Sequence, residues 1–163
     1  QLMCDVPYGV LISGGLDYDV TKASKKLINE LRINNSVKFT GPYKQEDAPS
    51  IYNYANAYIM TKHNDPCPNT VIEALSCGLP VLYSHSGGVP ELVGNDAGIA
   101  LECKKSWESV QVPCVKDICD GMLDIANRYG EMSNFARNRA VKKFDIKSWI
   151  NRHRVIFEKL LSK

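Results

Sequence analysis

Short apolar runs alternate along the chain with longer stretches whose apolar residues recur at helical spacing. The short runs mostly hold four to six residues and do not alternate with polar ones, which is typical of strands buried on both faces of a parallel sheet. We expect strands at residues 8–13, 37–39, 57–60, 80–83 and 98–101. We expect helices at residues 18–33, 48–55, 70–77, 115–129, 131–143 and 146–162.

Strands that are separated by helices indicate βαβ units, so we expect an α/β fold with a doubly wound parallel sheet flanked by helices. The 163 residues suit one domain, with an α/β core at 1–114 and a helical part at 115–163. In such folds ligands bind at the carboxyl ends of the strands. The residues predicted to lie along that edge are Gly14-Gly15, Gly41-Pro42 and the loops 61–70 and 84–88.

Composition and charge narrow the class of protein. The apolar fraction of 44% is ordinary for a globular protein, and the six cysteines include no Cys-x-x-Cys pair, so we expect reduced cysteines and a cytoplasmic location. Residues 136–163 carry nine Lys and Arg against two acidic residues. We interpret these basic side chains as the solvent-exposed face of a helix, and contact with an anionic membrane surface is the alternative interpretation. No nucleic-acid partner is expected, because the basic residues gather at one end and the edge loops offer no aromatic platforms for bases.

The stretch from Asn64 to Gly94 holds the candidate chemistry. The amides of Asn69, Thr70 and Val71 begin a predicted helix, and unpaired amides at a helix N-terminus favour an anion such as a diphosphate. Glu73, one turn into the helix, would accept hydrogens from ribose hydroxyls, and Asp65 in the preceding loop would accept from the hydroxyls of a sugar. The simpler alternative is that Thr70 and Glu73 form a capping box and that Asp65 faces water.

This stretch resembles the E-x7-E region of retaining nucleotide-sugar glycosyltransferases related to the glycogen and sucrose synthases, which have the GT-B architecture. The family pattern corresponds here to Asp65, Glu73, "GLPV" (78–81) and "GGVPE" (87–91). Upstream, "VLISGG" (10–15), "VKFTGPY" (37–43) and "YNYANAYIMTK" (52–62) are similar to further family segments in the same order. The resemblance implies a Rossmann-like, donor-binding domain from the C-terminal half of such an enzyme.

The resemblance also implies roles for individual residues. Asp65 would be the catalytic-site residue that binds the hydroxyls of the donor sugar, although the family usually has Glu there, and Glu73 would bind the ribose. The amides of residues 69–71 would bind the diphosphate. Gly14 would allow close approach of the ligand, and Gly41, Pro42 and Tyr43 would face the base.

The implied reaction transfers a sugar from a nucleoside diphosphate sugar to an acceptor hydroxyl with retained anomeric configuration, without a metal ion or a cofactor. The acceptor, a glycan or a lipid-linked sugar, would be bound by an N-terminal domain that this chain lacks. His63 and His85 lie at the predicted edge as minor catalytic candidates. The final helix carries an apolar face, which would pack back across the domain gap or dock on a membrane. A nucleotide-sugar epimerase and a non-catalytic nucleotide-binding module remain alternatives.

Overall fold

The computed structural model describes residues 9–104 and 106–162. Its strands pair as two parallel sheets, one with the order β1-β2 and one with the order β3-β4-β5. The strands are β1 (Val10–Ser13), β2 (Val37–Gly41), β3 (Tyr58–Met60), β4 (Val81–Ser84) and β5 (Gly98–Leu101). The helices are α1 (Tyr18–Glu30), η1 (Asn34–Ser36), η2 (Gln45–Asp47), α2 (Ala48–Tyr52), α3 (Asn69–Ser76), α4 (Val89–Val93), α5 (Val115–Asn127), α6 (Tyr129–Phe144) and α7 (Ile146–Leu161).

Contacts divide the chain into two compact units, residues 1–51 and 52–163. In the first unit β1 and β2 pair in parallel, with Val10 opposite Val37 and a register shift between Ile12 and Ser13. The helix α1 connects these two strands. This βαβ connection is the one that the alternation of apolar runs and helical stretches predicts.

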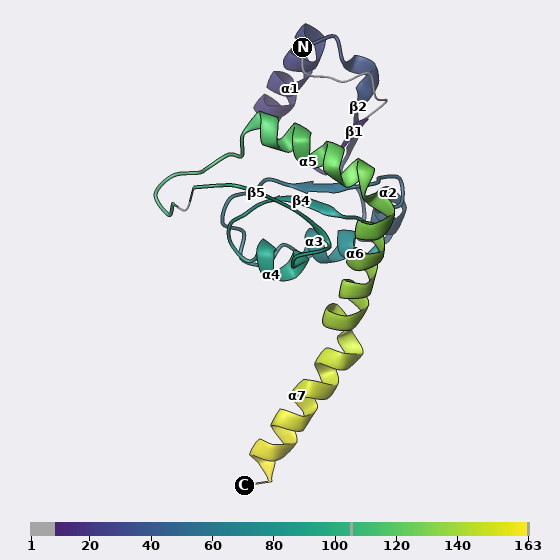
Figure 1. The fold of residues 1–163 in the computed structure, drawn as a ribbon, viewed down its shortest axis with the longest axis vertical. Coiled ribbons are helices and arrows are strands. Elements are labelled where there is room, and N and C mark those ends of the chain that lie inside the picture. The colour runs from purple at the N-terminus through teal and green to yellow at the C-terminus, as the bar shows by residue number, and fades with distance from the viewer. Residues whose placement is uncertain (1–8, 105, 163) are drawn as a thin grey trace. The chain divides into compact units, whose positions relative to one another are not determined.

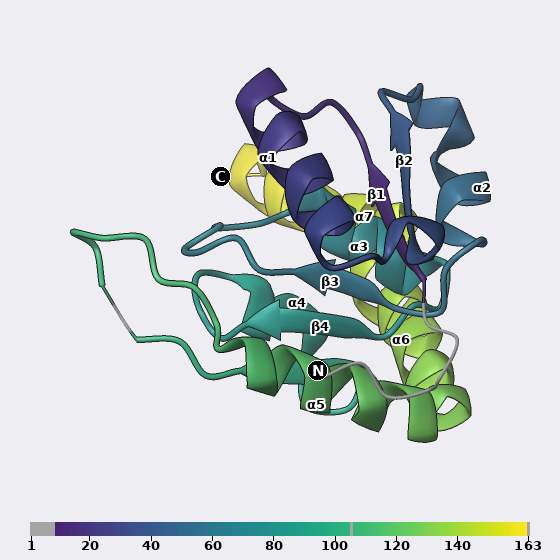
Figure 2. The same cartoon turned by 90° about the horizontal axis from the view of Figure 1, so that it is seen from above.

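The second unit contains the larger sheet, with β4 at its centre (Figures 1 and 2). Every residue of β4 is buried, which accounts for the uninterrupted apolar run in the sequence. The helices α3 and α4 cover one face of this sheet and α5 covers the other (Figure 1). A cluster between the sheet and the helices α5 and α6 forms part of the core: Leu82, Leu101, Ile125 and Met132.

The two C-terminal helices differ in burial. The helix α6 packs against α3, and its residues Met132, Ala136 and Ala140 are buried. The helix α7 has no buried residue, although it carries the predicted apolar face. On this face Trp149 is 50% exposed and stacks on His153, with the ring centroids 3.7 Å apart. None of the helices in the described ranges is long and apolar enough to cross a membrane.

The predicted class, parallel sheet flanked by helices with a helical C-terminal part, is confirmed. Among the described residues the strands form two sheets, whereas the sequence analysis expected one. The helix α4 is not predicted by the sequence pattern, because a five-residue helix is too short to show a helical period. The residues that indicate α4 are a proline in its first turn, Pro90, followed by Glu91.

Candidate functional site

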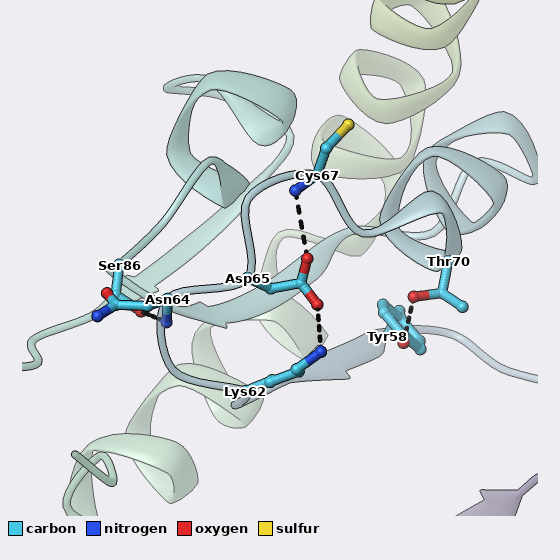
Figure 3. Close-up of polar contacts among 7 residues, drawn as sticks. All are labelled: Tyr58, Lys62, Asn64, Asp65, Cys67, Thr70 and Ser86. Carbon is cyan, nitrogen blue, oxygen red and sulfur yellow. Dashed lines mark hydrogen bonds and ion pairs between the residues drawn. The ribbon is translucent and has the colours of Figure 1, made fainter. Parts of the chain in front are cut away.

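The loop between β3 and α3, residues 61–68, lies at the carboxyl end of β3 and is joined to the loop that follows β4. The hydroxyl of Ser84 donates to the carbonyl of Thr61 at 3.0 Å. The Asn64 amide donates to Ser86 Oγ at 3.0 Å (Figure 3). The backbone of residues 64–66 lies directly against Gly87 and Gly88, and these contacts fix the two loops to each other.

Asp65 lies in this loop with its carboxylate only 13% exposed. Its Oδ2 atom forms an ion pair with Lys62 Nζ at 2.8 Å, and its Oδ1 atom accepts a hydrogen bond from the Cys67 amide at 3.2 Å (Figure 3). The expectation that Asp65 simply faces water is therefore wrong. Each carboxylate oxygen can accept more than one hydrogen, so Asp65 retains capacity for a ligand. Lys62 was not among the predicted site residues, and its only signal in the sequence is its place three residues before an acid.

The helix α3 begins at Asn69, with Pro68 as its N-cap residue. Nowhere in the described ranges do the amides of Asn69 and Thr70 have a partner, whereas the Val71 amide donates to the Pro68 carbonyl at 3.1 Å. The structure therefore leaves two of the three predicted amides for an anion. The third amide, that of Val71, is paired with the Pro68 carbonyl because the helix begins one residue earlier than predicted.

Glu73 is held by a tyrosine rather than by a capping box. The Tyr52 hydroxyl donates to Glu73 Oε2 at 3.0 Å, and the Tyr58 hydroxyl donates to Thr70 Oγ1 at 2.9 Å. The predicted Thr70–Glu73 capping box is therefore wrong, because Thr70 lies inside the helix and both side chains are bound by tyrosines. Asp65 precedes the start of α3 and Glu73 follows it. Asp65 is held by Lys62 and the Cys67 amide, and Glu73 by Tyr52.

Two arginines of α6 bind the far ends of the helices near the site. Arg137 donates to the carbonyl of Ser76, the last residue of α3. Arg139 donates to the carbonyls of Leu92 and Glu91 at the end of α4, at 2.5 and 2.6 Å. A cation at a helix C-terminus compensates the helix dipole and its unpaired carbonyls. Arg137 still lies on the solvated helix face expected for residues 136–163, whereas Arg139 is only partly exposed.

Cys77 is the C-cap residue of α3, at the opposite end of the helix from the candidate ligand. Burial raises the pKa of the Cys77 thiol above its ordinary value, and the nearby Arg137 only partly opposes this. A raised pKa keeps the thiol protonated near neutral pH, so little of it is in the nucleophilic thiolate form. All five cysteines within the described ranges are free.

The other predicted site residues lie in the first unit. Gly14 follows β1 with φ of 113°, and its amide donates to the carbonyl of Gly41 at 3.0 Å. Gly41 ends β2 with φ of 73°, so both positions need glycine for the backbone conformation itself. Pro42 and Tyr43 follow directly, and the Tyr43 side chain is exposed. The β1–β2 pairing brings these four residues together, and their role in binding a base stays a prediction.

The remaining candidates concern histidines and metals. The Nε2 atom of His63 is buried and has no hydrogen-bond partner in the part of the chain that the structure describes. His85 Nδ1 lies 3.8 Å from a carboxylate oxygen of Glu102. An Asp-x-Asp pair, Asp17 and Asp19, escaped the sequence analysis, and it caps α1 through a hydrogen bond from the Asp19 amide to Asp17 Oδ1 at 2.8 Å. Metal and cofactor independence stay predictions.

Comparison with known proteins identifies the family. The sequence model described as "Glycosyl transferases group 1" matches residues 5–112, which is more than half of the chain. The chain belongs to this family. The resemblance seen in the sequence is thereby confirmed.

Two curated relatives are similar over different lengths. The chain is 24% identical to the MMP alpha-(1->4)-mannosyltransferase of Mycolicibacterium hassiacum over 86% of its own length and 33% of the relative. It is 33% identical to the D-inositol 3-phosphate glycosyltransferase of Corynebacterium urealyticum over 55% of its length and 22% of the relative. The chain therefore spans a third or less of these relatives.

Solved structures show the same fold at lower identity. The sucrose-phosphate synthase of Thermosynechococcus elongatus superposes with a TM-score of 0.75 at 19% identity, over 93% of this chain and 38% of that one. The Anabaena protein HepE in complex with UDP superposes with a TM-score of 0.72 at 22% identity, over 98% of this chain and 42% of that one. These likenesses establish the fold that this chain shares with GT-B glycosyltransferases.

Proposed function

We propose that this group 1 glycosyl transferase chain is the donor-binding part of a retaining, metal-independent enzyme of glycan or polysaccharide biosynthesis. The enzyme transfers a sugar from a nucleoside diphosphate sugar to an acceptor hydroxyl. The observation that carries the proposal is the start of α3, where two amides without a partner among the described residues lie between the carboxylates of Asp65 and Glu73. Support also comes from the family match and from the UDP and UDP-glucose complexes of HepE.

In the proposed arrangement the diphosphate lies against the amides of Asn69 and Thr70. Oriented amides and the helix dipole stabilise negative charge, and they stabilise it most on a departing diphosphate. Glu73, held by Tyr52, accepts from the ribose hydroxyls, and Asp65 accepts from the hydroxyls of the donor sugar. The protein's contribution is the positioning of the reactants and the stabilisation of charge. Gly41, Pro42 and Tyr43 are proposed to face the base, with Gly14 allowing close approach of the ligand.

The partners of the whole enzyme are proposals of the same kind. Because the chain spans only part of its relatives, we place the binding of an acceptor glycan or lipid-linked sugar in a part of the protein outside this chain. The basic residues between positions 136 and 163 are suited to a peripheral contact with the cytoplasmic face of a membrane.

Titration calorimetry of this chain with UDP, GDP and ADP tests the donor assignment. We expect at least one of them to bind. The Glu73→Ala variant should weaken that binding by about 1–3 kcal/mol, because hydrogen bonds to a charged group are lost. Glu30→Ala, at an exposed position of α1, is the matched control and should leave the affinity unchanged.

Two results would contradict the proposal: no binding of any of the three nucleotides, or equal affinities of the Glu73→Ala variant and the unmodified chain. The full-length protein separates the alternatives. Glu73→Gln should abolish sugar transfer, whereas retained activity would indicate a non-catalytic module. Turnover of the donor sugar to an epimer without any acceptor would indicate an epimerase, which the family match disfavours.

A further inference from the structure

The loop between β5 and α5, residues 102–114, exposes apolar side chains that the core does not use. Trp107 is 92% exposed, and Val110 and Val112 are 80% and 77% exposed. A solvent-exposed indole does not contribute the stabilising free energy that burial of an aromatic ring provides. A fully exposed tryptophan next to a candidate site therefore points to a ligand or partner that covers it.

The part of the loop around Trp107 has a defined conformation. Ser106 Oγ accepts hydrogen bonds from the amides of Glu108 and Ser109, at 3.2 and 3.1 Å. Gln111 Nε2 donates to Ser109 Oγ at 2.8 Å. Trp107 therefore occupies a side-chain-stabilised turn, and its ring is presented to solvent by that turn.

A hydrogen bond joins this turn to the candidate site. Asn64 Nδ2 donates to the carbonyl of Ser106 at 2.8 Å. Asn64 immediately precedes Asp65, and Ser106 immediately precedes Trp107. Backbone and side-chain dimensions therefore keep the α-carbons of Asp65 and Trp107 within about 15 Å of each other. Because β3, β4 and β5 pair in parallel, the loops after β3 and β5 leave the sheet at the same edge.

The chemistry of the loop favours a sugar over a membrane. The flat face of an indole packs well against the C–H face of a pyranose ring, and the neighbouring Glu108 carboxylate can accept from its hydroxyls. Residues 102–114 carry two Glu and two Lys, so the loop has no excess of positive charge to attract an anionic bilayer.

We propose that Trp107 forms a sugar-stacking subsite next to Asp65, where its ring covers the apolar face of a pyranose. The proposal deepens the proposed function and rests on it. The pyranose is either the hexose of the donor or a ring of the acceptor glycan, and the two sources share the same chemistry at this position.

Fluorescence of a Trp149→Phe chain tests the proposal, because Trp107 is then its only tryptophan. The probes are UDP, GDP, UDP-glucose and GDP-mannose, and the methyl α-glycosides of glucose, mannose, galactose and N-acetylglucosamine with the nucleotide present. A change in emission with a nucleotide sugar but not with its nucleotide identifies the donor hexose. A change with a methyl glycoside identifies an acceptor ring. In the Trp107→Ala chain, where only Trp149 emits, none of these probes should alter the emission.

Trp107→Ala should weaken the binding of the responding sugar by about two- to tenfold without changing the affinity for the nucleotide. Unchanged Trp107 emission with every sugar probe overturns the proposal, and so does a blue shift on vesicles of phosphatidylcholine and phosphatidylglycerol. Calorimetry with the nucleotides distinguishes a failure of the Trp107 subsite from a failure of the proposed donor binding. If a nucleotide binds and no sugar alters Trp107, the donor assignment stands and only this subsite is lost.

Discussion

The loop that contains Asp65 depends on a glycine in the neighbouring loop, and Gly88→Ala tests this dependence. The Gly88 amide donates to the Asp65 carbonyl at 2.9 Å. A Cβ atom at position 88 would lie 1.9 Å from the carbonyl oxygen of Pro66, and this obstacle is backbone rather than a flexible side chain. The substitution therefore displaces the loop instead of being absorbed by a rotamer change.

The structure sets the size of the effect. Real Cβ atoms essentially never lie closer than 3.0 Å to such an atom, so the Pro66 carbonyl must retreat by at least about 1 Å. Overpacking of this kind lowers the free energy of unfolding by about 1–3 kcal/mol. A 1 Å displacement of a group at the reacting centre reduces catalysis by roughly 100-fold.

Urea unfolding followed by circular dichroism measures the stability of the Gly88→Ala chain, and calorimetry measures its nucleotide affinity. In the full-length protein, kcat/KM for sugar transfer should fall by roughly 100-fold because Asp65 moves with the loop. Gly130→Ala in α6 is the matched control, because a Cβ atom there meets no heavy atom within 4 Å. This control should raise stability by up to about 1 kcal/mol and leave affinity unchanged. A folded Gly88→Ala protein with unaltered stability and kcat/KM would refute the coupling of the two loops.

Arg139→Met should lower the free energy of unfolding by about 1.5–3 kcal/mol, because the two carbonyls at the end of α4 lose a charged donor. Arg152→Met on exposed α7 is the control for urea unfolding, and equal losses in both variants would contradict the assignment. The amide of Ser148, which donates to Asp145 at the start of α7, lowers the pKa of that carboxyl below 3.8, its ordinary value. The stabilisation of α7 by this cap is therefore fully present above pH 3.8. It is lost as the pH falls through the pKa of Asp145 in the folded protein, which is the lower of the two values. Asp145→Ala should weaken the negative ellipticity at 222 nm above pH 3.8, and the difference from the unmodified chain should disappear in stronger acid. A difference that does not depend on pH would argue against the cap.

Local patterns were sufficient to predict the order of most helices and strands. The uninterrupted apolar residues of β4 indicate a strand buried on both faces, and the structure confirms this for all four residues. Helical periodicity placed α1, α5, α6 and α7 within a few residues of their ends. These patterns are readable because burial repeats along each element with the period of the backbone.

Side-chain partners in the candidate site required the tertiary structure. The Tyr52–Glu73 hydrogen bond joins residues 21 positions apart, and the arginine contacts of α6 join residues 47 to 61 positions apart. The sequence pattern of Thr70 and Glu73 matched a capping box, yet two tyrosines from outside the helix compete for these side chains.

The sequence by itself determined the α/β class, the element order and the family, because each depends on residue types within a short window or on their order along the chain. Only the structure showed that Lys62 pairs with Asp65, in a loop where Asn64 adopts a positive φ of 54°. Only the tertiary structure joined Asn64 to Ser106, across 42 residues. The physical reason is that the partner of a polar group depends on which loops the packed sheet brings together, and periodicity along one element carries no information about its neighbours.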